Sequence, residues 1–265
     1  MAKESVAKDT GMMGQWREMK ARHPNAILLY RVGDFYETFF EDAEVASRAL
    51  GLTLTSRNNG GAAEVPLAGV PARAVGEYVR RLVQQGYRVA ICEQVEDPKL
   101  AKGIVRREVI ETVTPGAVFA DELLDGSRNN FVAAVAPVAG VGMGGEIGLA
   151  VADISTGDFR LAITAEVELE AALARYQPRE VLVPTPHAQR PTPRLPDDVL
   201  VTERDAWEFD VAMAADDLAR QFRVHSLEGL GLGEADAPAL AAAGALLRYL
   251  RELQPSGLPH LGRPI

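Results

Sequence analysis

Residues 31–42, RVGDFYETFFED, place four aromatic side chains among acidic ones and are the first candidate for chemistry in this sequence. Gly33-Asp34 is a hairpin-turn signal, and in a strand that leaves this turn Phe35 and Glu37 share one face. Tyr36 and Thr38 then share the other face. Because a turn tip is exposed to solvent, a phenylalanine there indicates a functional surface.

Two other interpretations of this stretch stay open. Phe35 could be a core residue beside a solvated Glu37, since most phenylalanines are buried. If the stretch is helical instead, Phe35 and Glu37 project about 200° apart and cannot act together. Asp34 would in that case be an N-cap, with Glu37 at the N3 position of a variant capping box.

Asp153, in the apolar segment LAVADIST, is the one candidate for a metal-binding carboxylate. Metal-dependent nucleases place an aspartate on a central strand, and Asp158 and Glu146 are its neighbours in sequence. A two-metal site needs several converging carboxylates, and the sequence does not place a third. We favour the alternative that Asp153 ends its strand and hydrogen-bonds the following Ser-Thr-Gly turn.

Other patterns associated with catalysis or cofactors are weak or absent in the sequence. GVGMGG at 140–145 fits G-x-G-x-x-G, but it lies between two predicted strands, which favours a hairpin loop over a pyrophosphate site. No glycine is followed by a lysine, so the sequence has no P-loop. The histidines lack metal-ligand spacing and are His23, His187, His225 and His260.

The composition is that of a globular protein. The chain has 265 residues, 47% of them hydrophobic and 25% charged, which suits two domains that each bury a core. No apolar run approaches the roughly 18 residues of a membrane span, and the start has no apolar signal-peptide region. A single cysteine, Cys92, excludes a disulfide framework and suits a reducing cytosol. It is expected to be a small buried strand residue.

Charge is distributed unevenly along the chain. Residues 1–130 contain 17 Lys and Arg against 18 Asp and Glu, whereas residues 131–265 contain 11 against 19. The first half holds all five lysines and is the candidate for nucleic-acid contact, whereas the acidic second half is a poor surface for a polyanion. The basic residues that could contact phosphates, or be ordinary solvated charges, are Arg57, Lys99, Lys102, Arg106 and Arg107.

In the first half, the apolar pattern predicts an α+β domain with a mixed sheet. A helix after Pro71 has its core face at i, i+3, i+4, i+7 and i+8, starting from Val75. The predicted helices are 13–23, 41–50 and 71–85, and the predicted strands are 26–32, 35–39, 52–57, 87–95 and 104–113.

In the second half, three strand candidates lead into alternating helices and strands, the pattern of an α/β layer fold. The predicted strands are 131–138, 146–154, 158–164, 180–184 and 199–202, and the predicted helices are 166–176, 211–222 and 237–253. The start of the chain, residues 1–12, is predicted to be a frayed tail.

Several motifs together resemble one family, the MutS mismatch-recognition ATPases. GDFYETF at 33–39 is similar to the family's Phe-x-Glu motif. Further similar segments follow in the family's order: EVPLAGVP and the continuous stretch to residue 98, KGIVRREVIETVTPG, ADISTGDF and LLRYLRELQPSGLPHL. The resemblance covers nearly the whole chain from about residue 13.

This resemblance implies a domain plan. Residues 13–116 would be the mismatch-binding domain, residues 117–129 a linker, and residues 130–253 a connector domain with a ribonuclease-H-like α/β layer. Residues 254–265 would begin the lever region. The chain would then be a fragment of a MutS-like protein or a truncated relative.

The resemblance also implies site residues. Phe35 matches the phenylalanine that wedges into the duplex beside a mispaired base, and Glu37 matches the glutamate that hydrogen-bonds that base. The positions that match residues near DNA are Val32, Arg57, Leu67 and Gly69. No catalytic residue and no metal ligand are implied in this chain.

The implied partners are mismatched double-stranded DNA and, through the connector domain, MutL. The full-length family forms dimers or tetramers and binds ATP and magnesium in an ATPase domain outside this chain, so this chain is expected to be no enzyme and to hold no cofactor. The implied location is the bacterial cytosol or nucleoid. Two rival hypotheses are a protein-interaction module alone and a metal-dependent nuclease that uses Asp153.

Overall fold

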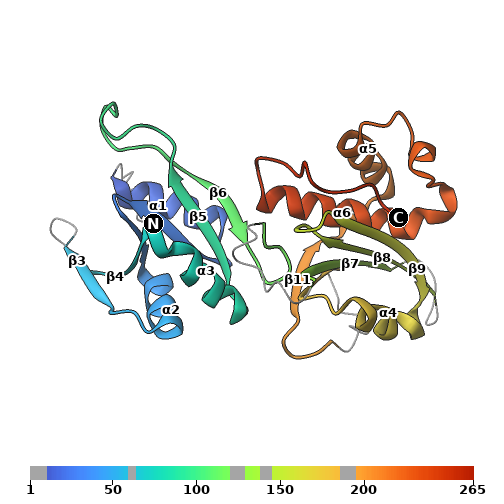
Figure 1. Cartoon of the computed structure of the whole chain (residues 1–265), viewed down its shortest axis with the longest axis horizontal. Coiled ribbons are helices and arrows are strands. Elements are labelled where there is room, and N and C mark those ends of the chain that lie inside the picture. Colours follow the sequence, from blue (N-terminus) through green and yellow to red (C-terminus); the bar gives the residue numbers. More distant parts are fainter. Residues whose placement is uncertain (1–10, 59–63, 120–128, 138–144, 186–194) are drawn as a thin grey trace, which may run out of the picture. The chain divides into compact units, whose positions relative to one another are not determined.

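A computed structural model describes residues 11–58, 64–119, 129–137, 145–185 and 195–265 (Figure 1). The chain divides into two compact units, Met1–Val113 and Thr114–Ile265, and each is built on one mixed β-sheet. The predicted fold class, an α+β unit followed by an α/β unit, is confirmed. Among the described residues, no helix is long and apolar enough to cross a membrane.

The sheet of the first unit has six strands in the order β3-β4-β2-β1-β5-β6. β1 and β5 are parallel, and the other neighbouring pairs are antiparallel. The strands are β1 (Ala26–Val32), β2 (Phe35–Phe39), β3 (Thr55–Asn58), β4 (Glu64–Pro71), β5 (Arg88–Gln94) and β6 (Arg107–Val113). The helices are α1 (Met12–Arg22), α2 (Phe40–Leu50) and α3 (Val75–Gln84), with a 3-10 turn η1 (Ala72–Ala74) before α3.

The strand β4 is the element that the sequence pattern did not predict. Its prolines and glycine argue against a strand, yet Pro66 pairs with Ser56 of the edge strand β3 and Pro71 lies at the strand end, opposite Phe35. The helix expected to start at Pro71 begins later as a result, because η1 intervenes and α3 starts at Val75.

Helices cover both faces of the first sheet. On one face, Met13 and Trp16 of α1 pack against Leu28, Tyr30 and Phe39, and the ring centroids of Trp16 and Phe39 are 5.9 Å apart. On the other face lie α2 and α3, whose apolar stripes are buried as the helical spacing predicts. Cys92 is buried on β5, as expected.

The sheet of the second unit has five strands in the order β11-β10-β7-β8-β9. The pairs β7–β8 and β8–β9 are antiparallel, while β10 is parallel to both β7 and β11. The strands are β7 (Phe131–Pro137), β8 (Glu146–Asp153), β9 (Asp158–Ala165), β10 (Glu180–Thr185) and β11 (Leu200–Asp205). The helices are α4 (Leu169–Tyr176), α5 (Val211–Phe222) and α6 (Ala237–Leu253), with 3-10 turns η3 (Glu166–Glu168), η4 (Ala206–Phe209), η5 (Leu227–Leu230) and η6 (Glu234–Asp236).

In the second unit, α5 and α6 lie on one face of the sheet and α4 lies on the other. Residues of α5 and α6 form one core with the small side chains of β7 and β8, and residues of α4 form the other. α6 packs very close to β8: a Cβ atom added to Gly148 would lie only 1.8 Å from the carbonyl oxygen of Pro238. Glycine and alanine therefore set the spacing between this helix and the sheet.

A buried carboxylate anchors the start of the second unit. Glu180 is fully buried and accepts hydrogen bonds from the hydroxyl groups of Thr114, Thr202 and Tyr249, each at 2.5 Å. The structure places the boundary between the units at Val113 and Thr114. Ala117 and Val118, the first residues of the predicted linker 117–129, are buried.

The C-terminal residues also belong to the second unit. The Gly262 amide donates to the Gly157 carbonyl at 2.8 Å, and the Ile265 amide donates to the Phe159 carbonyl at 3.0 Å. The Leu161 amide in turn donates to the Ile265 carbonyl at 2.9 Å. Residues 262–265, the last part of the segment 254–265 that was expected to begin a lever region, are therefore paired with the edge of this sheet.

Some predicted features lie outside the described residues: the tail at 1–10, the loop at 59–63, most of the linker, the glycines at 140–144 and His187. The strands on either side of the glycine-rich segment, β7 and β8, pair antiparallel, and Pro137 is opposite Ile147. The segment therefore joins two strands, and no helix N-terminus follows it.

Candidate nucleic-acid interface

The hairpin formed by β1 and β2 carries the predicted site residues. Val32 pairs with Phe35 and Tyr30 pairs with Glu37, so Gly33 and Asp34 are a two-residue turn, as the sequence predicted. Gly33 has a φ of +57°, which glycine adopts without a steric penalty. Phe35 is the first residue of β2 and therefore lies at the hairpin tip.

Burial along β2 separates the two faces of the strand. The side chain of Phe35 is 48% exposed and Glu37 is half-buried, whereas Tyr36 and Thr38 on the opposite face are 5% and 1% exposed. The capping-box interpretation is wrong because residues 35–39 form a strand. The interpretation of Phe35 as a core residue is also wrong, because almost half of its side chain is open to solvent.

Phe35, Glu37 and Gly69 are immediate neighbours on the more open face. In the antiparallel pair of β2 and β4, Glu37 lies opposite Gly69. A Cβ atom on Gly69 would lie 3.7 Å from Cγ of Glu37 and 3.9 Å from Cδ1 of Phe35. A side chain at residue 69 would therefore be in van der Waals contact with both the ring and the Glu37 side chain.

Val32 and Leu67 border the same face. Val32 pairs with Phe35 and Leu67 pairs with Phe39, and both are half-buried against the core under α1. Arg57 pairs with Val65, which places its backbone on β3, two strands away from β2. The residues suggested by the resemblance therefore come from four adjacent strands.

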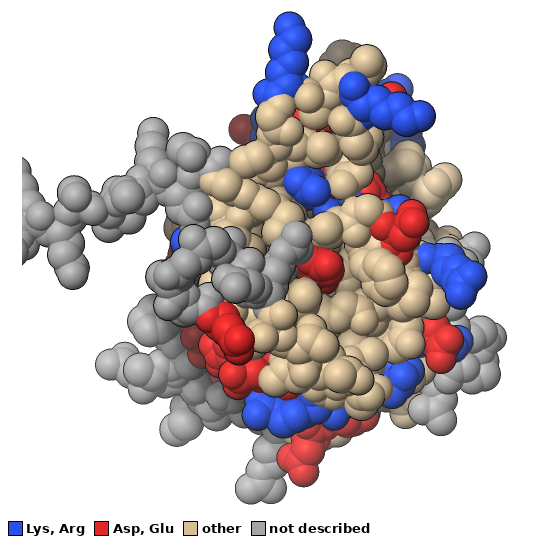
Figure 2. Space-filling model, turned by 90° about the vertical axis from the view of Figure 1, so that its left-hand side faces the viewer, with Lys and Arg blue, Asp and Glu red and all other residues tan. Residues whose placement is uncertain are grey.

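The face changes from covered to open along β2. Phe39 is completely buried against Trp16 and Tyr30, Glu37 is half-buried, and Phe35 is exposed. The buried end fixes the strand, while the open end presents the ring. Figure 2, which views the molecule from the side of β3 and β4, shows a largely uncharged expanse with a few acidic side chains in it and both basic and acidic side chains at its margins.

A polar row crosses the opposite face of the sheet behind Phe35. The Tyr36 hydroxyl donates to Oε2 of Glu93 at 2.6 Å, and Nη1 of Arg31 lies 3.7 Å from the same oxygen. The Arg31 guanidinium also lies over the Tyr36 ring, 5.2 Å from its centroid. Burial, and next the hydrogen bond to Glu93, raise the pKa of Tyr36 to about 12. Sequence analysis missed this row because its members lie on three strands.

Four of the five basic residues proposed for phosphate contacts divide into two groups by burial. Arg107 is buried, donates to the carbonyls of Arg31 at 2.6 Å and Val105 at 2.8 Å, and stacks over the Tyr30 ring. It is therefore a structural residue, and its assignment to phosphate contact is wrong. The exposed residues, which all lie on the connection between β5 and β6 or next to it, are Lys99, Lys102 and Arg106.

Asp153 has the structural role that we favoured. Its Oδ1 accepts from the Ser155 amide at 3.0 Å and the Ser155 hydroxyl at 2.6 Å, and its Oδ2 accepts from the Asn130 amide at 3.0 Å. Among the described residues, no group of three or more His, Cys, Asp and Glu side chains is arranged to hold a metal ion. The observed geometry gives no support to a nuclease site at Asp153.

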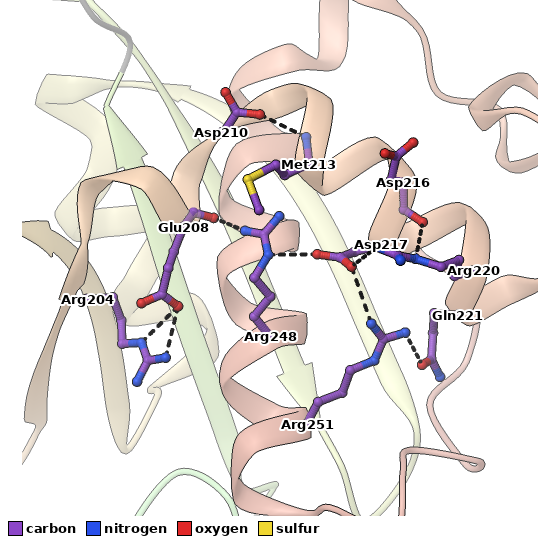
Figure 3. A network of polar contacts seen from close by, with 10 residues as sticks. All are labelled: Arg204, Glu208, Asp210, Met213, Asp216, Asp217, Arg220, Gln221, Arg248 and Arg251. Atoms are coloured by element: carbon purple, nitrogen blue, oxygen red, sulfur yellow. Dashed lines mark hydrogen bonds and ion pairs between the residues drawn. The ribbon is translucent and has the colours of Figure 1, made fainter.

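The second unit carries a network of ion pairs between α5 and α6 (Figure 3). Buried Asp217 pairs with Arg248 and with Arg220, each at 2.7 Å, and with Arg251 at 3.5 Å. Arg248 also donates to the carbonyl of Glu208. Near the start of α5, the side chains of Trp207, Val211 and Met213 are exposed.

The chain is thus a two-module protein of mixed α and β structure, with an exposed ring and a carboxyl group on an open sheet face of the first unit and exposed apolar side chains on the second. Family models identify both modules: residues 10–122 match MutS domain I and residues 130–262 match MutS domain II. The chain belongs to the MutS family.

Curated relatives agree with this assignment, and each carries the description DNA mismatch repair protein MutS. The chain is 43% identical to the protein of Chlorobium phaeobacteroides over 95% of this chain and 29% of that one. It is 42% identical to that of Chlorobaculum tepidum over 99% and 30%, and 43% identical to that of Rhizobium meliloti over 99% and 29%. The chain thus spans less than a third of the length of these relatives.

Proposed function

We propose that this chain recognises mispaired or unpaired bases in double-stranded DNA during mismatch repair. The Phe35 ring inserts from the minor groove beside the affected base, and Glu37 hydrogen-bonds that base. The observation that supports this proposal is the exposed Phe35 ring beside Glu37, on a sheet face that is open at the hairpin tip.

The proposed selectivity comes from the deformability of the DNA. Inserting an apolar wedge unstacks a base step and kinks the duplex, which costs roughly a few kcal/mol. A mispaired or unpaired base has already lost part of its stacking and pairing, so the same kink costs less there. Because a phenyl ring has no hydrogen-bonding group, one such site accepts many different mismatches.

The spacing of the two side chains suits this task. Residues i and i+2 of a strand are roughly 6.7 Å apart, and successive bases along one DNA strand are about 3.4 Å apart. A ring between two bases therefore leaves the Glu37 carboxyl group within reach of a base one or two steps away. Gly69, which is exposed beside both side chains and has no side chain of its own, does not obstruct a base edge that approaches them.

Backbone contacts complete the proposal. Lys99, Lys102 and Arg106 are exposed, and together with Arg57 they are proposed to contact phosphates. Such contacts position a protein on the duplex without reading its sequence. ATP and magnesium binding, and dimer or tetramer formation, are proposed for other regions of the full-length protein.

Equilibrium binding of the full-length protein to a matched duplex and to duplexes with a G·T pair or one unpaired base tests the proposal. We expect tighter binding to both altered duplexes at a fixed salt concentration. Equal affinities for all three would contradict the proposal, because the wedge would then gain nothing from weakened stacking.

Glu37→Ala is expected to lower affinity for mismatched DNA by about 1.5–3 kcal/mol, the range for a hydrogen bond to a charged group. Affinity for matched DNA should stay the same or rise, since a negative charge near phosphates is removed. Fluorescence anisotropy with both duplexes measures this difference. Glu77→Ala, which removes an exposed carboxylate from α3, is the control and should change neither affinity. An equal loss for both duplexes would show that Glu37 is structural.

For the second unit, we propose a protein-docking role, with MutL as the partner. Trp207, Val211 and Met213 support it, because each is a large apolar side chain exposed to solvent, and exposed apolar surface is used in interaction sites. The ion pairs of Asp217 with Arg248 and Arg251 join α5, which carries Val211 and Met213, to α6. The acidic charge of this half of the chain disfavours DNA as the ligand of this surface.

Met213→Asp in the full-length protein should weaken MutL capture at least about tenfold, because burying an unpaired charge in an interface is costly. Surface plasmon resonance with immobilised MutL measures the change. Val167→Asp is the control, since Val167 is exposed on η3, near α4 on the other face of the sheet. If the wild type and the Met213→Asp variant bind MutL equally well, this surface does not dock MutL.

A further inference from the structure

We propose that Tyr36, Arg31 and Glu93, the cross-strand row, are positioning residues that hold the Phe35 hairpin rigid and thereby set the ratio of mismatched to matched DNA binding. The row lies on the face of the sheet opposite Phe35 and Glu37, so it touches no DNA in this arrangement. This inference rests on the proposed wedge function of Phe35.

The register of three strands builds the row. Tyr36 of β2 lies directly opposite Arg31 of β1, and the parallel pairing of β1 with β5 places Glu93 next to Arg31. Tyr36 is also the residue between Phe35 and Glu37 in the sequence. Its hydroxyl contact with Glu93, at 2.6 Å, therefore fixes the backbone between the two proposed DNA-contacting side chains.

Arg31 connects the Gly33-Asp34 turn to the cross-strand row. Its Nε donates to the carbonyl of Gly33 at 2.6 Å, and its guanidinium contacts both Glu93 and the face of the Tyr36 ring. The carbonyl of Arg31 accepts a hydrogen bond from buried Arg107 at 2.6 Å. The hairpin tip is thus connected to β5 and β6, the next two strands beyond β1 in the sheet.

Rigidity matters because insertion of a ring meets resistance. A duplex resists unstacking, and the resistance is larger when the bases are correctly paired. Backbone pairs with β1 and β4 hold β2 within the sheet, but the tip at Phe35 is where these pairs end, so it bends away unless side chains also support it. If the hairpin tip bends, the protein binds both duplexes without kinking them. Its affinities for mismatched and matched DNA then become equal. The row prevents this bending from the far side of the sheet.

Matched variants on β2 test the inference in the full-length protein. Tyr36→Phe removes a buried hydroxyl group that donates to Glu93, and Thr38→Val removes one from the same face that has no partner among the described residues. We expect Tyr36→Phe to lower the ratio of mismatched to matched affinity about three- to tenfold, through weaker mismatch binding alone. Thr38→Val should keep the wild-type ratio.

A second pair of variants separates positioning from folding. Glu93→Gln keeps an acceptor for the Tyr36 hydroxyl and should retain most of the ratio, whereas Glu93→Ala should lose it. The fluorescence of 2-aminopurine placed beside the mismatch reports unstacking directly. It should fall for Tyr36→Phe and Glu93→Ala and stay at the wild-type level for Thr38→Val.

The outcomes distinguish this inference from the proposed function. If Phe35→Ala loses the preference and Tyr36→Phe keeps it, the positioning role is overturned and the wedge stands. A parallel loss of affinity for both duplexes by Tyr36→Phe, with a lower melting temperature, overturns the positioning role as well. If the Phe35→Ala variant still prefers mismatched DNA, both the wedge function of Phe35 and the positioning role of the row are contradicted.

Discussion

Phe35→Ala in the full-length protein is expected to abolish the preference for mismatched DNA. Stacking of a base on an aromatic side chain contributes about 1–3 kcal/mol by alanine substitution, so mismatch affinity should fall roughly 5- to 150-fold. Matched DNA should bind as before, because backbone contacts supply sequence-independent affinity. Competition between labelled mismatched and unlabelled matched duplexes measures the ratio in one experiment.

The exposure of the ring makes this variant interpretable. Phe35 is 48% exposed, so its truncation removes little buried area, and the melting temperature should stay close to that of the wild type. Ile110→Ala is the control, because Ile110 is 44% exposed on β6 at the far edge of the same sheet. It should leave the ratio unchanged. If the Phe35→Ala variant still discriminates between mismatched and matched duplexes, insertion of the Phe35 ring is not part of the mechanism.

Gly148→Ala is expected to give the largest loss of stability in the second unit. The added Cβ would lie 1.8 Å from the carbonyl oxygen and 2.1 Å from the carbonyl carbon of Pro238. Both atoms are backbone, so α6 must move away from β8 and disturb the core that Leu246 and Leu250 share with the sheet. Overpacking of this kind costs about 3 kcal/mol or more.

Thermal unfolding followed by far-UV circular dichroism, with limited proteolysis to assign the transition to the second unit, measures this loss. Gly233→Ala is the matched control. Gly233 precedes η6 with a φ of −139°, and an added methyl group there would meet open space, with no contact within 4 Å. It should melt within a degree or two of the wild type. Equal melting of the two variants would contradict the close packing of α6 on β8.

Local patterns predicted most of the elements in this fold. The apolar run 26–32 gives β1, the Gly33-Asp34 signal gives the hairpin, and the 3.6-residue period from Val75 gives the buried face of α3. β4 was missed because proline and glycine argue against a strand in isolation. Its pairing with β2 and β3 outweighs those preferences.

The site was predicted in part for a similar reason. Alternation along a strand places Phe35 and Glu37 on one face whatever the partners of that strand are. The contact of Tyr36 with Glu93 depends on the sheet order, because 57 positions separate the two residues. Charge alone also misplaced Arg107, whose guanidinium is satisfied by main-chain carbonyls and lies over the Tyr30 ring.

The pairing of residues 262–265 with β9 has a consequence for how the second unit behaves in a crowded solution. β9 is the last strand of its sheet, and an outer strand normally displays free amide and carbonyl groups that template addition of a foreign strand. Gly157, Phe159 and Leu161 already use such groups in hydrogen bonds to Gly262 and Ile265. That stretch of the sheet is therefore closed to strand exchange and to fibril growth.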